Sequence, residues 1–131
     1  MKYYLAPMEG LTGYIYRNAY HHHFMPMDKY FAPFIVATSN RKMNHREWSD
    51  LLPEHNQELT LIPQILTNKT EDFLNTASRL WEMGYQEINL NLGCPSKTVV
   101  TKGKGSGFLD KTIELERFLD QMFSRLEGKL S

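Results

Sequence analysis

Short apolar segments alternate with longer amphipathic segments along the chain. Strands are predicted where β-branched and aromatic residues gather between turn residues, at residues 3–6, 29–36, 59–66 and 88–92. Helices are predicted where apolar residues recur every three to four positions, at residues 14–22, 46–52, 70–83 and from 112 to the glycine at 128. Strand and helix therefore alternate four times, which predicts an α/β fold with parallel strands and crossover helices.

The last two helices each carry an apolar stripe that is expected to face the core. These stripes consist of Phe73, Leu74, Ala77, Leu80 and Trp81 in one helix, and of Leu115, Phe118, Leu119, Met122, Phe123 and Leu126 in the other. Thr12, Thr70 and Thr112 are predicted as helix N-caps, and Gly84 as a helix stop. Pro63 falls inside the third strand and predicts either an irregular position or a sheet edge.

The composition limits what kind of protein this is. A length of 131 residues allows one domain or part of one, and a hydrophobic content of 41% is enough for a core. Because 15 basic residues balance 15 acidic ones, net charge gives no argument for nucleic-acid binding, although a local patch is left open. The one cysteine excludes an internal disulfide and fits a reducing compartment. We expect no signal peptide and no membrane span, and hence a cytoplasmic protein.

The residues from Glu87 to Phe108 hold the strongest candidate for chemistry. Cys94 follows a short strand and lies between Gly93 and Pro95, neither of which continues a ladder. Cys94 is therefore predicted at a strand-to-loop corner, with a small buried cysteine as the alternative. Three glycines follow, which are expected to let the loop approach a substrate closely: Gly103, Gly105 and Gly107.

In parallel α/β folds, chemistry collects in the loops that follow the strands. Beyond Pro7 and Met8, the polar residues of these loops are Arg41, Lys42, His45, Arg46, Gln64, Lys69, Asn91, Cys94, Lys97, Lys102 and Lys104. Basic residues predominate, which predicts a positive patch for the phosphates of a cofactor or of a nucleic acid. Lysines that only keep these loops solvated are the alternative, and the sequence leaves that choice open.

Three consecutive histidines, His21 to His23, invite a metal-binding interpretation. Successive helical residues point about 100° apart, so the three rings cannot face one ion. Solvated histidines at a helix C-terminus are the expected arrangement, because cations are favourable there.

Several of these residues belong to motifs that resemble one family. Residues 6–12 read Ala-Pro-Met-Glu-Gly-Leu-Thr, with Arg17 after them, and residues 63–65 read Pro-Gln-Ile. Residues 89–97 read Asn-Leu-Asn-Leu-Gly-Cys-Pro-Ser-Lys, with a glycine-rich tail at residues 102–107. Over essentially the whole chain, these motifs resemble the N-terminal half of a tRNA-dihydrouridine synthase. The Asn-Leu-Gly-Cys-Pro-Ser core is specific, whereas Ala-Pro-Met-x-Gly also opens other flavin barrels.

The resemblance implies a partial (β/α)8 TIM barrel of about four βα units that uses FMN and NADPH to reduce the 5,6 double bond of uridine in tRNA. Pro7 and Met8 would pack against the isoalloxazine ring, and Gln64 would bond its pyrimidine edge. Asn91 would help to position a flipped-out uracil, and Cys94 would protonate C5 after hydride reaches C6. The resemblance further implies tRNA contacts in the basic loops, here at Arg41, Lys97 and Lys102, and no metal site.

Family members are about twice as long or more, so the resemblance implies that residues 1–131 are an N-terminal half-barrel. The second half-barrel and a helical tRNA-binding domain would then be absent. Half a barrel leaves two strand edges open, which favours self-association as a homodimer. Two other functions stay open: a non-catalytic half-barrel module that self-associates, and a flavin barrel acting on free pyrimidines, such as a dihydroorotate or dihydropyrimidine dehydrogenase.

Overall fold

The computed structural model describes residues 1–39 and 42–126. Its four strands form one parallel sheet in the order β1-β2-β3-β4. The strands are β1 (Tyr4–Leu5), β2 (Lys29–Val36), β3 (Leu61–Leu66) and β4 (Asn89–Leu90). The predicted α/β fold with parallel strands is confirmed, and its strand order is that of a partial TIM barrel.

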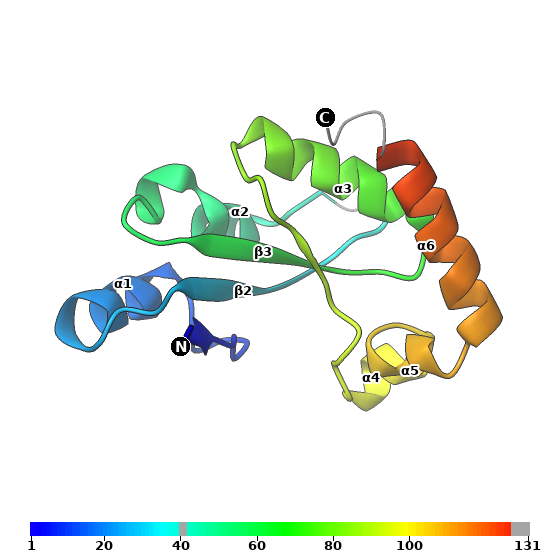
Figure 1. The fold of residues 1–131 in the computed structure, drawn as a ribbon, viewed down its shortest axis with the longest axis horizontal. Helices are drawn as coiled ribbons and strands as arrows, with labels where there is room; N and C mark the ends of the chain where they lie inside the picture. Colours follow the sequence, from blue (N-terminus) through cyan, green and yellow to red (C-terminus); the bar gives the residue numbers. More distant parts are fainter. Residues whose placement is uncertain (40–41, 127–131) are drawn as a thin grey trace.

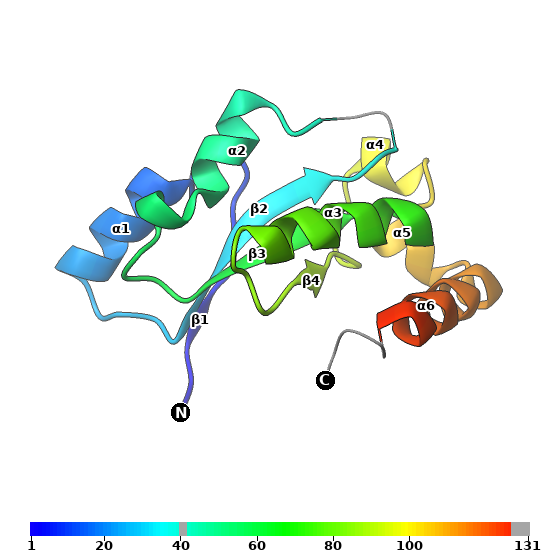
Figure 2. The ribbon, with the colours of Figure 1, turned by 90° about the horizontal axis from the view of Figure 1, so that it is seen from above.

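Helices connect successive strands and continue beyond the last one (Figures 1 and 2). They are α1 (Tyr14–His23), α2 (His45–Leu51), the 3-10 turn η1 (Pro53–His55), α3 (Thr70–Glu82), α4 (Lys97–Val100), α5 (Ser106–Leu109) and α6 (Thr112–Leu126). Helix α3 packs on β3, and α6 packs against α3. None of the helices in the described ranges is long and apolar enough to cross a membrane.

The main core lies between the sheet and α3, and it extends to α6. Phe73, Ala77 and Leu80 of α3 are buried, as are Phe118, Met122 and Leu126 of α6. The Phe118 ring meets the rings of Phe73 and Phe108 edge to face, a favoured aromatic geometry. Both apolar stripes are confirmed except at Phe123. That side chain is 52% exposed because it lies just outside the buried face of α6.

Strand β2 has the predicted bounds, whereas the others are shorter than expected. β1 pairs with β2 only at Tyr4 and Leu5, and β4 pairs with β3 only at Asn89 and Leu90. β-Forming residues continue past these positions, but a strand ends where its partner no longer lies alongside. One backbone bond still extends the ladder, from the Asn91 N–H to the Ile65 carbonyl at 2.9 Å.

A bulge separates two stretches of regular pairing between β2 and β3. Phe31 pairs with Ile62 and Phe34 pairs with Gln64, so Ala32 and Pro33 together oppose Pro63. Neither proline has an N–H to donate to the ladder, and a bulge tolerates that loss. Because β3 is a central strand, Pro63 marks an irregular position and not an edge.

The three predicted threonine caps are wrong: Thr112, for example, is the first residue of α6, and the Leu115 N–H donates to the Lys111 carbonyl before it. Helix α1 has Gly13 as its N-cap residue, and the Asp50 carboxylate accepts from the Tyr14 N–H at 2.6 Å. Thr70 is the first residue of α3, and its hydroxyl donates to the Gln121 Oε1 atom of α6 at 3.0 Å. The predicted stop at Gly84 is confirmed by its φ of 100° directly after the C-cap of α3. Gly128 lies outside the described residues.

Candidate functional site

Three of the predicted site residues form one hydrogen-bonded chain at the carboxyl ends of β3 and β4. The Asn91 Nδ2 atom donates to Gln64 Oε1 at 2.9 Å. The Asn91 Oδ1 atom accepts from the backbone N–H groups of Cys94, at 3.0 Å, and Gly93, at 3.2 Å. Gln64 is buried, while Asn91 and Cys94 are half-buried. The amide of Asn91 thus ties the Cys94 backbone to Gln64.

This arrangement follows from the register of the sheet. Gln64 pairs with Asn89, and side chains two residues apart on a strand point to the same face. Asn91 therefore projects on the same side as Gln64. Its side-chain oxygen then closes a local turn over Gly93 and Cys94, a role that suits asparagine. The predicted placement of Cys94 at a strand-to-loop corner is confirmed.

The glycine-rich segment folds back onto Cys94. The Cys94 carbonyl accepts from both the backbone N–H and the hydroxyl of Ser106, each at 3.0 Å. Gly105 has a φ of 55°, and a Cβ atom there would lie 2.7 Å from that carbonyl. A Cβ on Gly107 would lie 2.7 Å from the Val100 carbonyl. These two glycines therefore permit close contacts within the protein, whereas the sequence predicted that they approach a substrate.

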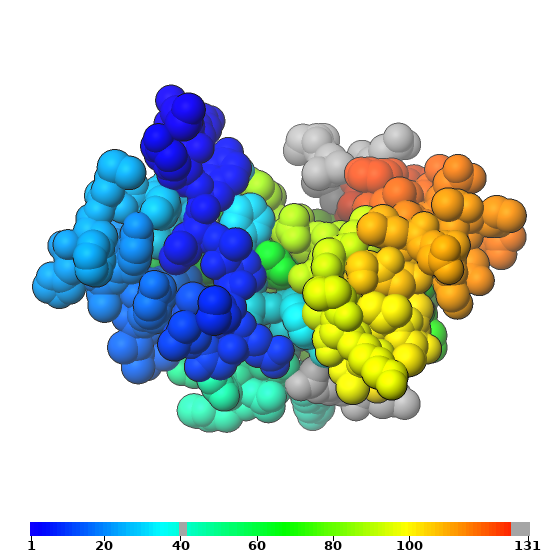
Figure 3. Space-filling view, turned by 90° about the horizontal axis from the view of Figure 1, so that it is seen from below, coloured from blue at the N-terminus to red at the C-terminus, as the bar shows by residue number. Residues whose placement is uncertain are grey.

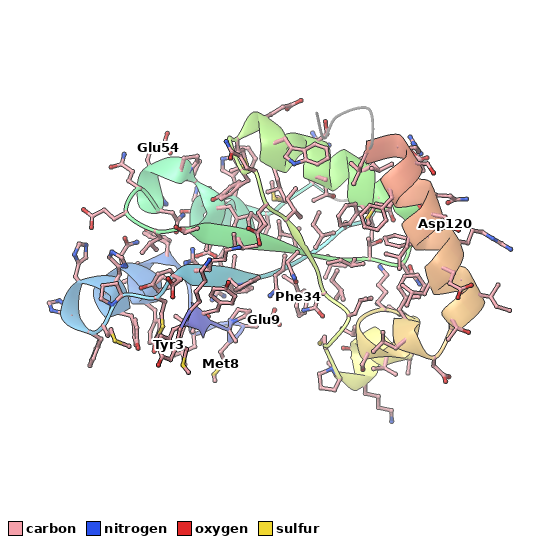
Figure 4. All side chains as sticks on the ribbon, in the orientation of Figure 1. Tyr3, Met8, Glu9, Phe34, Glu54 and Asp120 are labelled. Atoms are coloured by element: carbon pink, nitrogen blue, oxygen red, sulfur yellow. The ribbon has the colours of Figure 1, made fainter. Side chains whose placement is uncertain are left out.

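Pro7 and Met8 lie on the other side of β2 from this chain. Pro7 is half-buried, and the Met8 side chain is 61% exposed, projecting from the N-terminal segment beside Glu9 (Figure 4). Seen from below, the N-terminal segment and the yellow α4 region face each other across the molecule, with cyan and green atoms of the β2 and β3 regions between them (Figure 3). Within the described ranges, no hydrogen bond joins Pro7 or Met8 to Gln64, Asn91 or Cys94.

Comparison with known proteins adds a sequence relationship to this geometry. Residues 4–131 match the family described as Dihydrouridine synthase (Dus). The chain belongs to the dihydrouridine synthase family. Proteins named probable tRNA-dihydrouridine synthase from Staphylococcus aureus (strain COL) and Staphylococcus epidermidis (strain ATCC 12228 / FDA PCI 1200) are 34% and 33% identical to it over 109 residues. Probable tRNA-dihydrouridine synthase 2 from Bacillus subtilis (strain 168) is 29% identical over 109 residues.

Each of these matches covers 80% of this chain and 32% of the relative. The chain therefore spans about a third of the length of the curated relatives that it matches. The partial TIM barrel described above is consistent with membership of the dihydrouridine synthase family.

Basic residues in this family member gather where β3 and β4 end. Lys97 and Lys102 are exposed, which is equally expected of lysines that contact a polyanion and of lysines that only keep the loop solvated. Arg41 lies outside the described residues. The Asn68 side chain donates to the carbonyls of Lys102, at 3.0 Å, and Gly103, at 3.2 Å, and so joins the two loops. Asn68 was not singled out by the sequence; its place directly after the third strand was the available signal.

Lys69 and Lys104 extend this basic group. Burial lowers the pKa of Lys104, and the positive charges of Lys102 and Lys69 lower it further, against an opposing effect of Asp72. The Lys104 ammonium group is therefore repelled by those of Lys102 and Lys69 and attracted more strongly by the Asp72 carboxylate. Repulsion of this kind is relieved when an anion binds between such groups.

The histidine run is anchored to its surroundings within the protein. His21 Nδ1 lies 3.0 Å from the Tyr30 hydroxyl, and His22 Nε2 lies 3.3 Å from the Glu58 carboxylate. His22 and His23 are exposed, as expected of solvated histidines at a helix end, whereas His21 is half-buried. The part of the chain that the structure describes has no group of three His, Cys, Asp or Glu side chains able to hold a metal ion.

A buried charge network behind the N-terminal segment was missed by the sequence analysis. Arg17, fully buried, pairs with Asp50, whose Oδ2 atom lies 3.0 Å from its Nη1 atom. Arg17 Nη2 also donates to Asn56 Oδ1 at 3.0 Å. Nearby, burial and the Asp50 charge raise the pKa of Tyr85 to about 12, against the lowering effect of Arg17. The Tyr85 hydroxyl donates to the Leu51 carbonyl at 2.6 Å, which joins the segment before β4 to α2.

A hollow of about 730 Å³ opens between the N-terminal segment, β2 and α2. Glu9, Phe34 and Arg46 are among the residues that line it, and Glu9 and Phe34 are seen together in Figure 4. Gln64, Asn91 and Cys94 do not line this hollow. It is therefore separate from the hydrogen-bonded chain, and Pro33 of the bulge in β2 is among the residues that line it.

Proposed function

We propose that this chain carries the proton donor and part of the flavin site of an enzyme that reduces the 5,6 double bond of uridine in tRNA. The observation that supports this most strongly is the Gln64–Asn91–Cys94 chain, which holds a half-buried thiol at the carboxyl edge of a parallel sheet. Residues 1–131 would form the N-terminal half of the barrel. NADPH would supply the electrons, and a protein that acts on tRNA would work in the cytoplasm.

The residues present fit an FMN ring. Pro7 and the exposed Met8 side chain offer apolar contact without competing hydrogen bonds. Gln64 uses its oxygen for Asn91, and its Nε2 atom donates to no partner among the described residues, which leaves a donor for the pyrimidine edge of the ring. When bound, FMN supplies the hydride that reaches C6 of uracil.

The protein's own part in the chemistry is to hold the base and move one proton. One Asn91 amide hydrogen bonds Gln64, so the second is free to meet a uracil carbonyl. The Cys94 S–H bond breaks as its proton goes to C5, and the resulting thiolate takes a proton from solvent, which reaches this half-exposed residue. The target base has to leave its stack, and the loops at the sheet edge are open to receive it.

The basic loops would position the tRNA. Lys97 and Lys102 are exposed beside the Cys94 corner, and Lys69 and Lys104 add charge to the same edge. Phosphate contacts from such residues fix the orientation of a nucleic acid without reading its sequence. Arg41 is proposed to join them, from the loop after β2.

A visible absorption spectrum of the purified chain tests this proposal. We expect a flavin band that survives desalting after incubation with FMN, because Pro7 and Met8 would offer the ring an apolar face and Gln64 would offer it a donor. Replacing Gln64 with Leu should weaken FMN binding about tenfold, since one hydrogen bond and the support of Asn91 are lost. The exposed Gln86→Leu variant is the matched control and should bind normally. Absence of a flavin band at saturating FMN would contradict the proposal.

A flavin barrel acting on free pyrimidines is the first alternative. It would bind FMN equally well, so the spectrum does not separate the two. The basic loops favour tRNA, because a free base offers no phosphates. Activity on unmodified tRNA but not on uracil or dihydroorotate separates them.

A half-barrel module that self-associates is the second alternative, and we propose a homodimer in either case. In the described residues, β1 and β4 are both edge strands, and an edge presents unpaired backbone groups. Several large apolar side chains in or next to β1 and α1 are also exposed, which favours association: Tyr3, Tyr4, Ile15, Phe24 and Met25. Light scattering should give twice the chain mass of 15.4 kDa. A monomer with a cooperative melt would contradict the homodimer, and a dimer without flavin would favour the non-catalytic module.

A further inference from the structure

We propose that Arg17 is a positioning residue, which acts through Thr12 to fix the backbone of Met8 so that only the Met8 side chain is presented to a ligand. This inference rests on the proposed function, in which Met8 contacts the flavin ring. It concerns a buried cation that takes no part in the chemistry described above.

The relay, by which we mean the contacts from Arg17 through Thr12 to Met8, begins at the ion pair of Arg17 with Asp50. Arg17 Nη1 donates to the Thr12 carbonyl at 2.9 Å and to Asp50 Oδ2 at 3.0 Å. Arg17 Nη2 donates to the Asp50 carbonyl at 2.9 Å, and so fixes the guanidinium against α2 as well. One fully buried side chain therefore holds the start of α1, the preceding loop and α2 together.

The relay continues from Thr12 to Met8. The Met8 N–H donates to Thr12 Oγ1 at 2.7 Å, and the Thr12 hydroxyl lies 3.2 Å from the Met8 carbonyl. That carbonyl also accepts from the backbone N–H groups of Leu11, at 3.1 Å, and Thr12, at 3.0 Å. Both backbone polar groups of Met8 are thus satisfied inside the loop.

A consequence follows for the ligand. Pro7 has no N–H, and the N–H and carbonyl of Met8 are engaged, so this loop has no free backbone group at Met8 to offer a flavin. What it offers is a thioether side chain that is 61% exposed on a fixed backbone. Polar recognition of the ring then falls to Gln64, on the other side of β2.

Pairing of β1 with β2 cannot hold the backbone of Met8 in place. β1 pairs with β2 only at Tyr4 and Leu5, so the ladder ends before Pro7. The segment would otherwise be free to move, and an apolar surface that moves loses affinity for a flat ring. A buried arginine with several acceptors is a rigid anchor, because its planar donors are fixed relative to one another.

The test uses Thr12, since Arg17 variants are prone to unfold. Thr12→Val keeps the shape and removes the hydroxyl, while Thr12→Ser keeps the hydroxyl and is the control. Without flavin, Thr12→Val should speed hydrogen exchange of the Met8 amide about threefold to tenfold, as expected for the loss of one hydrogen bond. Exchange of the Tyr30 amide, which bonds the Thr60 carbonyl, should not change. Thr12→Ser should leave both amides as in the unmodified chain.

Two further measurements connect this loop to Arg17 and to the ligand. Arg17→Lys keeps the charge but has one terminal amino group in place of two, and it should also speed Met8 exchange. Unchanged exchange of the Tyr30 amide shows that this variant is still folded. The double variant with Thr12→Val should speed Met8 exchange by less than the product of the two single-variant factors. Thr12→Val should raise the dissociation constant for FMN about fivefold, whereas Thr12→Ser should not.

The outcomes separate this inference from the proposed function. Unchanged Met8 exchange in Thr12→Val or in Arg17→Lys overturns the relay. Normal FMN binding by Thr12→Val overturns the positioning role. If the unmodified chain binds no FMN, the proposed function fails, and with it the role toward a flavin. The exchange measurements still decide whether Arg17 fixes the Met8 backbone.

Discussion

Replacing Asp50 with Ala is expected to lower the free energy of unfolding by about 3–5 kcal/mol, because it leaves the Arg17 guanidinium buried without its counter-ion. Arg17 is fully buried, and the Asp50 side chain is only 17% exposed, so water cannot replace the lost carboxylate easily. The same substitution removes the acceptor of the Tyr14 N–H at the start of α1. Urea unfolding followed by circular dichroism at neutral pH measures the change.

The matched control for Asp50 is Glu54→Ala. Glu54 lies exposed on the 3-10 turn just after α2 and is labelled at the surface in Figure 4. Its removal alters the net charge equally and should change the free energy of unfolding by no more than about 0.5 kcal/mol. A loss below about 1 kcal/mol for Asp50→Ala would show that the network can rearrange around the arginine, against our reading of it as a rigid anchor.

Under the proposed function, in which Cys94 is the proton donor of a dihydrouridine synthase, replacing Cys94 with Ala is expected to lower dihydrouridine formation about 100-fold to 10,000-fold, the usual contribution of a positioned general acid. The assay is a single turnover with unmodified tRNA, FMN and NADPH. The thiol is the only part removed, because Asn91 and Ser106 bind the Cys94 backbone and not its side chain. FMN retention and flavin reduction by NADPH should therefore continue.

Two further variants are compared with Cys94→Ala to show whether the thiol proton causes the loss of product. Cys94→Ser keeps a weaker proton donor and should retain more product than Cys94→Ala. Ser96→Ala, at an exposed position of the same loop, should leave product formation unchanged. Equal rates for Cys94→Ala and the unmodified chain would place the proton donor elsewhere and remove Cys94 from the mechanism.

The two functional clusters differ in how visible they are in the sequence. The position of Cys94 could be predicted because its sequence neighbours, Gly93 and Pro95, do not continue a strand or a helix. The hydrogen-bonded link from Cys94 to Gln64 could not be predicted, because that link depends on which strand pairs with β4 and in which register. The residues were predicted individually; their connection through Asn91 is a property of the sheet.

The failed helix caps have a similar cause. A threonine before a helix is a good candidate cap, yet the Thr12 hydroxyl bonds Met8, and the Tyr14 N–H at the start of α1 donates to Asp50, 36 residues away. Thr70 likewise bonds Gln121, on a helix that the local sequence does not reveal as its neighbour. Side chains with several possible partners take the one that tertiary packing brings within reach.

Hydrophobic spacing and the positions of glycine and proline determined the parallel α/β fold, the order of its elements, most of the core, and the corner that carries Cys94. These are local properties, because a residue's preference for strand, helix or turn depends mainly on its close neighbours in the chain. Only the tertiary structure decided that Arg17 and Asp50 form a buried pair, that Gly105 presses against Cys94, and that Asn91 joins Gln64 to the thiol corner. Each of those contacts joins residues far apart in sequence or in separate turns of the chain, and packing selects them from many partners that the sequence alone leaves equally available.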